Sequence, residues 1–298
     1  MVVTQLYERV QELITMQSSQ STLAELMSFD LDNFEKNCHE DGGRYWLAHQ
    51  FMQELGYDTW QAFQGVLLKA QATCARLEMN PSEAFIPHSF ISDDGQVIKT
   101  MKLTRFACLL TTLHADERKP PVAAAKVALA GLVDQVIAAK LSQQDVGRIE
   151  AREDLKAAET GMNAAAKFAG VQQGDYGIFK DAGIRGMYNR SLRELKALRG
   201  LAEKDVPYDH MGLTELAGNL FRVTQTAEKL RTTPNAGLPA AKHTAHTVGA
   251  EVRRMMINNS GVAPEFLPPA EDITTVKRGL KQTAKAMGKL DKPTKKKN

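Results

Sequence analysis

The segment from Asp209 to Leu230 constrains the fold more than any other part of this 298-residue chain. Its apolar residues recur at alternating steps of three and four, which places them on one stripe of an α-helix. They are Leu213, Leu216, Leu220, Val223, Ala227 and Leu230. Because such a stripe is stable only when it is covered, the segment predicts an amphipathic helix packed against other helices.

A polar row in the same segment follows the same steps. It consists of Glu215, Asn219, Arg222, Thr226 and Lys229. We expect this row to lie opposite the apolar stripe, either as a plain solvated face or as a surface that meets a partner. The candidate partner-binding residues are Asn219, Arg222, Gln225 and Lys229.

Composition predicts a mainly helical (α+β) protein with two domains. Hydrophobic residues make up 43% of the chain, which is enough for sizeable cores, and aromatic residues only 6%. The abundant Ala, Leu, Lys, Glu and Gln favour helices over strands. The three cysteines (Cys38, Cys74 and Cys108) form no CxxC pair, so we expect reduced thiols in a cytoplasmic protein.

Neither a secretory signal nor a membrane span is expected. Glu8, Arg9 and Glu12 interrupt the stretch in which a signal peptide would need an apolar run. The longest apolar stretch, residues 122–141, contains Lys126 and Asp134 at depths where a membrane helix would bury them.

The first half predicts a helical domain over residues 28–142, preceded by a helical extension over residues 1–27. Tyr45–Leu55 is expected to be a helix, with Gly56 as a left-handed C-terminal cap and a second helix from about Thr59 to Leu77. Two helices joined in this way form the skeleton of a helix-turn-helix, although many such skeletons are ordinary helical hairpins.

A β-hairpin is expected between His88 and Leu103, because Asp94-Gly95 is a strong turn signal between two apolar runs. Cations on and around it suit contacts with phosphate groups, and a solvated rim is the alternative. The candidate DNA-binding residues of this domain are Arg44, Lys69, Lys99, Lys102, Arg105, Arg118 and Lys119.

The second half predicts a helical domain over residues 143–270. It opens with a long charged helix, and its glycine-containing segment Asp175–Asn189 is interpreted as a tight packing element with Tyr188 over the bundle. Residues 271–298 are expected to be a flexible basic tail, with nine Lys or Arg against three carboxylates. Such a tail binds phosphate backbones or serves solubility.

No complete catalytic or metal-binding constellation is visible. His243 and His246 share a helical face, and Asp209, His210 and Glu215 form an acidic and imidazole-bearing cluster, but each set lacks further ligands at recognisable spacing. We therefore expect no metal, no cofactor and no catalysis, and a metal-dependent nuclease is the least favoured alternative.

Three blocks of the chain resemble the DNA-damage-inducible protein D family. The first is DHMGLTELAGNLFRVTQTAEKL at Asp209–Leu230, and the second, Arg44–Cys74, is similar to the family's BRO-type N-terminal domain. The third joins LTRFACLL at Leu103–Leu110 to RKPPVAAAKVALA at Arg118–Ala130. Between them, the blocks span most of residues 34–268.

The resemblance implies a non-catalytic bacterial protein of the SOS response, acting on DNA. It implies binding to DNA, or modulation of RecA-type recombinase filaments on single-stranded DNA, or both. BRO-type domains also occur in phage antirepressors and transcriptional regulators, so regulation is the alternative function. Neither a membrane nor a cofactor is expected as a partner, and self-association stays open.

Overall fold

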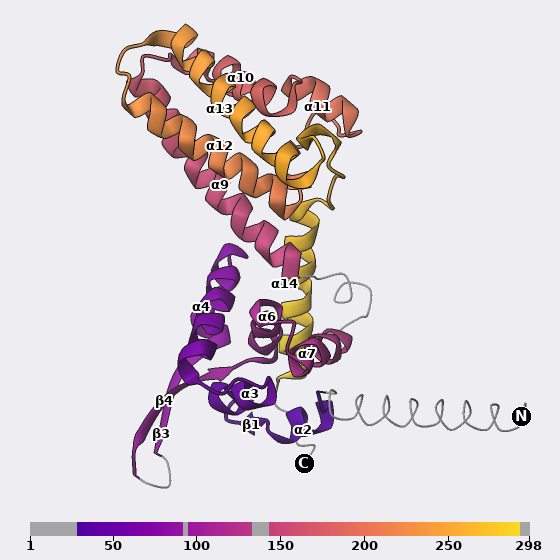
Figure 1. Cartoon of the computed structure of the whole chain (residues 1–298). Helices are drawn as coiled ribbons and strands as arrows, with labels where there is room; N and C mark the ends of the chain where they lie inside the picture. The colour runs from indigo at the N-terminus through magenta and orange to yellow at the C-terminus, as the bar shows by residue number, and fades with distance from the viewer. Residues whose placement is uncertain (1–28, 92–94, 133–142, 293–298) are drawn as a thin grey trace, which may run out of the picture. The chain divides into compact units, whose positions relative to one another are not determined.

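The computed structural model describes residues 29–91, 95–132 and 143–292, which form two compact units (Figure 1). The first unit comprises residues 1–141 and 279–298, and the second comprises residues 142–278. The predicted extension over residues 1–27 lies outside the described residues. Most of the described residues are helical and a small antiparallel sheet accompanies them, so the predicted fold class is confirmed.

The first unit combines short helices with the sheet. Its helices are α2 (Leu31–Lys36), α3 (Ala48–Glu54), α4 (Trp60–Arg76), α5 (Pro81–Ala84), α6 (Arg105–His114) and α7 (Pro120–Gly131). Its strands are β1 (His39–Glu40), β2 (Arg44–Leu47), β3 (Phe85–Ile91) and β4 (Val97–Leu103). The predicted β-hairpin is confirmed as β3 and β4, with Gly95 in the left-handed region at φ +79°.

The four strands follow the order β1-β2-β4-β3, so β3 lies at an edge of the sheet. Ala84 accepts a hydrogen bond from the Thr104 N–H (3.0 Å), just before the first β3–β4 pair, Phe85 with Leu103. Antiparallel ladders alternate, so the odd-numbered residues of β3 direct their backbone groups to the open edge. Pro87 is one of these residues, and it has no N–H to offer there.

The predicted helix over Tyr45–Leu55 is wrong in its first turn. Arg44–Leu47 forms β2, which pairs with β4 through Trp46 and Leu103, and the helix begins only at Ala48. Packing explains the difference, because the Trp46 ring is buried, stacks on Phe34 at 4.3 Å and donates a hydrogen bond to the Phe34 carbonyl (2.6 Å). The cap at Gly56 is confirmed, with φ +70°.

The second unit is a bundle of long helices. They are α9 (Gln143–Phe168), α10 (Tyr176–Tyr188), α12 (Leu213–Arg231) and α13 (Gly237–Ser260), with the shorter α11 (Leu192–Leu198) and three 3₁₀ turns, η1 (Gln173–Asp175), η2 (Pro207–His210) and η3 (Pro264–Phe266). Figure 1 shows α12 beside both α9 and α13, and α10 along α13. The helix predicted in the Asp209–Leu230 segment is therefore confirmed from Leu213 onward, whereas Asp209 and His210 belong to the turn η2.

Helices α10 and α13 approach each other closely through glycines. A Cβ atom on Gly249 would lie 2.5 Å from the Gly183 carbonyl oxygen, and one on Gly186 would overlap the His246 carbonyl. Glycine is needed here because the backbones themselves are in contact. The interpretation of Asp175–Asn189 as a tight packing element is confirmed, and Tyr188 is fully buried, which leaves its ring no face for a nucleobase.

The prediction that the polar row of α12 faces solvent is wrong. Glu215, Asn219 and Arg222 are at most 2% exposed, and Thr226 is fully buried. Tyr188 donates a hydrogen bond to Glu215 (2.7 Å), Asn219 donates one to the Tyr188 hydroxyl (2.6 Å), and Arg222 donates to Asn219 (3.2 Å) and to the Tyr208 hydroxyl (3.2 Å). These contacts form a polar network inside the bundle.

The expected flexible tail is also wrong for most of its length, since Ile273–Leu290 forms helix α14. One side of α14 is buried and carries Ile273, Val276, Leu280, Ala284 and Met287. The division between the two units falls within this helix, after Arg278. Residues 293–298 lie outside the described residues.

Substitution of Gly186 by Ala tests the close approach of α10 and α13. Alanine favours a helix by about 1 kcal/mol over glycine, but the overlap with the His246 carbonyl should reverse the sign and destabilise the second unit by about 1–3 kcal/mol. Gly161→Ala in α9 is the matched control, because nothing lies within 4 Å of the added carbon, and it should stabilise.

Urea unfolding of the full chain, followed by two spectroscopic signals, distinguishes the unfolding of one unit from that of the other. Both tryptophans, Trp46 and Trp60, belong to the first unit, so their fluorescence reports that unit, whereas circular dichroism reports helix loss in both. An unchanged or raised dichroism midpoint for Gly186→Ala would contradict the packing described.

Arg222→Ala should destabilise the second unit by about 2–4 kcal/mol, because it empties a buried site and strands the carbonyl oxygen of the Asn219 side chain. Lys229→Ala should change stability by less than about 0.5 kcal/mol, since Lys229 is half exposed and lies 3.6 Å from Glu251 in a loose surface pair. The same dichroism assay measures both variants. Equal midpoints for the two would mean that Arg222 is not a structural residue.

Candidate nucleic-acid interface

The seven cations predicted to bind DNA do not form one surface. Arg105 is the clearest correction: at 2% exposure it cannot reach a phosphate group. Its guanidinium lies over the Trp46 ring at 4.6 Å, forms an ion pair with Glu35, and bonds Asp291 through Nε at 2.9 Å. Arg105 therefore stabilises the first unit by joining α6 to α2 and to the end of α14.

Lys102 and Arg44 both form ion pairs with neighbouring carboxylates. Lys102 Nζ lies 2.9 Å from Asp41 and 4.3 Å from the centre of the Tyr45 ring. The hydrogen bond that Lys102 donates to Asp41 raises the pKa of Lys102. Arg44 pairs with Glu40 at 3.2 Å and lies 3.8 Å from Glu35. Both cations stay partly accessible, but neighbouring carboxylates offset their charge.

Arg118 and Lys119, just before α7, are also engaged. Arg118 is exposed but donates to both carboxylate oxygens of Asp116, at 2.8 and 2.9 Å. These hydrogen bonds lower the pKa of Asp116 to about 2. Lys119 donates to the Gly56 carbonyl at 2.7 Å and lies over the Tyr57 ring. Its ammonium thus caps the end of α3.

Lys69 and Lys99 are the two candidates of the first unit that are exposed and form no ion pair within the described residues. Lys69 lies on α4 and Lys99 on β4. The structure gives no shared site to Lys99, Lys102 and Arg105, because the last is buried and the second is paired. Of these three residues, Arg105 is therefore wrong as a phosphate contact, and Lys99 and Lys102 stay predictions.

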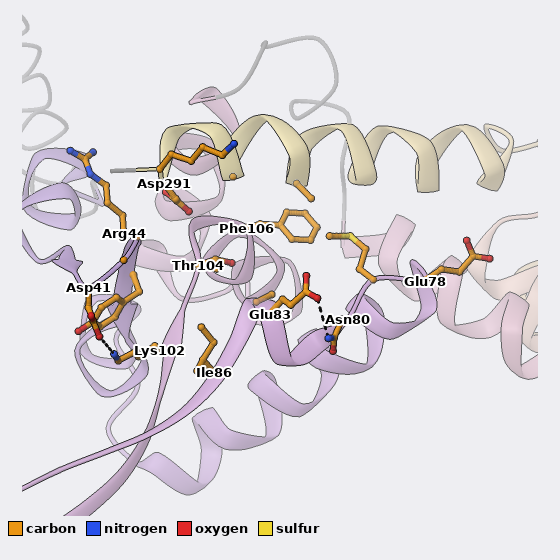
Figure 2. Close-up of a pocket in the computed structure, with 18 residues that line it drawn as sticks. Asp41, Arg44, Glu78, Asn80, Glu83, Ile86, Lys102, Thr104, Phe106 and Asp291 are labelled. Carbon is orange, nitrogen blue, oxygen red and sulfur yellow. Dashed lines mark hydrogen bonds and ion pairs between the residues drawn. The ribbon is translucent and has the colours of Figure 1, made fainter. Parts of the chain in front are cut away.

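A groove of about 750 Å³ lies in the first unit between α14, α5 and the sheet (Figure 2). Phe106, Ile86 and Met79 contribute apolar lining. Its charged lining consists of Asp41, Glu78, Glu83, Asp291, Arg44, Lys102 and Lys292. With four carboxylates against three cations, the lining of this groove has a net negative formal charge, which disfavours a phosphate backbone.

The solvent side of α14 carries a lysine row that the sequence interpretation placed in a flexible tail. The row consists of Lys281, Lys285 and Lys289, at steps of four, and continues into Lys292 just past the end of the helix; all four residues are exposed. Lys281 bonds Glu78 at 2.7 Å, whereas Lys285, Lys289 and Lys292 form no ion pair with any described residue. Three ammonium groups are therefore free to meet an anion.

A signal for this helix was present in the sequence. Ile273, Val276, Leu280, Ala284 and Met287 recur at steps of three and four. These residues are buried on one side of the helix, and the lysines lie on the other side. The row is thus a defined geometric feature and not only a local excess of charge.

Of the four candidate partner-binding residues on α12, Asn219 and Arg222 are buried in the polar network and cannot meet a partner. Gln225 and Lys229 are exposed. Together with Phe221 and Met255 they line a notch of about 190 Å³ between α12 and α13. The surface available on α12 is therefore smaller and more apolar than predicted.

Within the described residues, no three His, Cys, Asp or Glu side chains come together as a metal site would require. The three cysteines carry free thiols. In the same part of the chain, no helix combines the length and apolar character needed to cross a lipid bilayer.

Comparisons with known proteins agree on one family. Residues 141–276 match the model of the DinD C-terminal domain. The chain is 32% identical over 263 residues to the DNA damage-inducible protein D of Escherichia coli strain K12, covering 84% of this chain and 96% of that protein. No solved structure is significantly similar. The chain belongs to the DNA damage-inducible protein D family.

Proposed function

We propose that this protein takes part in the response to DNA damage by binding the phosphate backbone of DNA, without catalysing a reaction. Membership of the DNA damage-inducible protein D family supports the cellular context. The lysine row of α14 supports the mode of binding, and it is the observation on which the proposal rests.

The geometry of the row suits a polyanionic strand. Lys281 and Lys289 are eight residues apart on one helix, which corresponds to about 12 Å along its axis. A nucleic-acid strand presents about three phosphates over that length, at roughly 3.4 Å per phosphate in a duplex. Ammonium groups that replace condensed counterions strengthen binding without reading the base sequence.

The proposal includes single strands coated by a RecA-type recombinase. Backbone contacts carry no sequence information, so they suit damaged DNA, which is defined by its state and not by its sequence. For a protein partner on the same strand, Gln225 and Lys229 are the predicted α12 residues that remain exposed. Lys69 and Lys99 stay predictions as further phosphate contacts.

Replacement of Lys285 and Lys289 by Ala should weaken binding to a single-stranded oligonucleotide about tenfold at physiological salt. The slope of log K against log salt should become shallower by about 1.4, because each lost phosphate contact on a single strand removes about 0.7. Fluorescence anisotropy over a salt series measures both quantities.

The control variant removes the same formal charge from the first unit at ion-paired sites. Arg118→Ala with Lys126→Ala does so, since Arg118 pairs with Asp116 and Lys126 with Glu117. It should leave the affinity and the salt slope close to those of the wild type. Absence of DNA binding by the wild type, or a footprint restricted to one duplex operator, would refute the proposal and in the second case favour a transcriptional regulator.

A further inference from the structure

The second unit contains a groove of about 890 Å³ beside α10 and α11, the α10–α11 groove. Its lining is mostly polar and charged, and it consists of Asp181, Arg185, Ser191, Leu192, Arg193, Lys196, Ala197, Leu201 and Glu203. None of the cations that the sequence interpretation assigned to DNA lies here. The groove therefore needs an explanation of its own.

Two carboxylates around this groove, Asp181 and Glu194, already accept hydrogen bonds from other groups of the protein. Asp181 accepts one hydrogen bond from Arg185 Nε (2.7 Å) and another from the Leu192 N–H (2.8 Å). Glu194, in the same stretch of chain, closes the capping box of α11 through the Ser191 N–H and hydroxyl, both at 2.7 Å. Both carboxylates hold α11 in place, which leaves Glu203 as the remaining acidic group of the lining.

The cations, in contrast, keep donors available. Arg193 is exposed and forms no ion pair with any described residue. Lys196 donates to the Glu203 backbone carbonyl (2.6 Å), which orients the ammonium group without neutralising it. Arg185 uses Nε for Asp181 and is half exposed, and the outer nitrogens of its guanidinium form no hydrogen bond with a described residue. Arg193 and Lys196 are one helical turn apart and so share a side of α11.

We propose that the α10–α11 groove binds a second stretch of phosphodiester backbone, with Arg193 and Lys196 as the main phosphate contacts and Arg185 beside them. This inference rests on the proposed function and extends it from the first unit to the second. The charge pattern favours this groove over the groove of the first unit, where carboxylates outnumber cations.

Two separate phosphate sites on one chain make binding bivalent. Once one unit holds a strand, the second contact is intramolecular and gains from a high effective concentration, so weak sites combine into firm attachment. Damage to either site should then weaken attachment to a long strand, and damage to both should nearly abolish it.

The test replaces Arg193 and Lys196 by Gln in the full-length protein and titrates it against a labelled single-stranded oligonucleotide of about 40 nucleotides. We expect about a tenfold loss of affinity at physiological salt and a salt slope shallower by about 1.4, because two single-strand phosphate contacts are lost. Combination with the Lys285 and Lys289 substitutions should reduce binding further, close to background. Circular dichroism verifies that each variant is folded.

Lys167→Gln with Arg231→Gln is the matched control, since both residues are exposed cations of the second unit outside the groove. It removes the same formal charge and should leave binding unchanged. An equal loss in the control would show a mere effect of net charge and overturn the inference. Unaltered binding by the Arg193 and Lys196 variant, with binding still dependent on Lys285 and Lys289, would overturn the second site and leave the proposed function standing.

Discussion

Burial of arginine side chains is the constraint around which both units are built. Removing a guanidinium group from water is costly unless the group is paired with a carboxylate or hydrogen-bonded, so the elements that supply its acceptors become fixed to one another. In the first unit, Arg105 forms ion pairs with both Glu35 and Asp291. In the second unit, Arg148 donates to the Met211 carbonyl at 2.9 Å, and Arg199 donates through one Nη to Glu215 at 2.7 Å, whereas its Nε and other Nη are buried without a partner among the described residues. Arg222 completes the network through Asn219 and Tyr208. Burial raises the pKa of the Glu215 carboxyl, although Arg199 and Tyr188 act in the opposite direction.

Arginine and lysine side chains take different positions in this protein, and the difference indicates which cations are available to a ligand. Arg105 and Arg222, which the sequence predicts to bind DNA and a partner respectively, hold the fold, whereas the lysines of α14 project from a helix whose other side is buried. The planar guanidinium binds several acceptors at once, which suits an interior site, and the compact, strongly hydrated ammonium suits a solvent-facing row. Two of the exposed arginines, Arg185 and Arg193, lie at the groove of the second unit that we assign to phosphate.

Periodic features of the sequence predicted the fold well, and long-range contacts explain the errors. The helices α9 and α12 and the β3–β4 hairpin follow from spacing and turn signals that lie within each segment. The polar row of α12 was misplaced because it is offset from the apolar row by one residue, or about 100° around the helix, so a helix packed on two sides covers both. Arg105 could not be recognised as buried, since its partners lie 70 and 186 residues away in the chain. The lysine row was placed in a flexible tail because a dense run of like charges is typical of one, although the apolar period in the same segment predicts a helix.

The open edge of β3 has a consequence for the protein in the crowded cell. An exposed edge strand with apolar side chains such as Ile91, which is 73% exposed, is a template on which a foreign strand could add. Because Pro87 points its ring nitrogen to that edge, an incoming strand would face a gap in the row of donors and could not build an uninterrupted ladder. Pro87 thus makes the β3 edge a poorer template for an added strand.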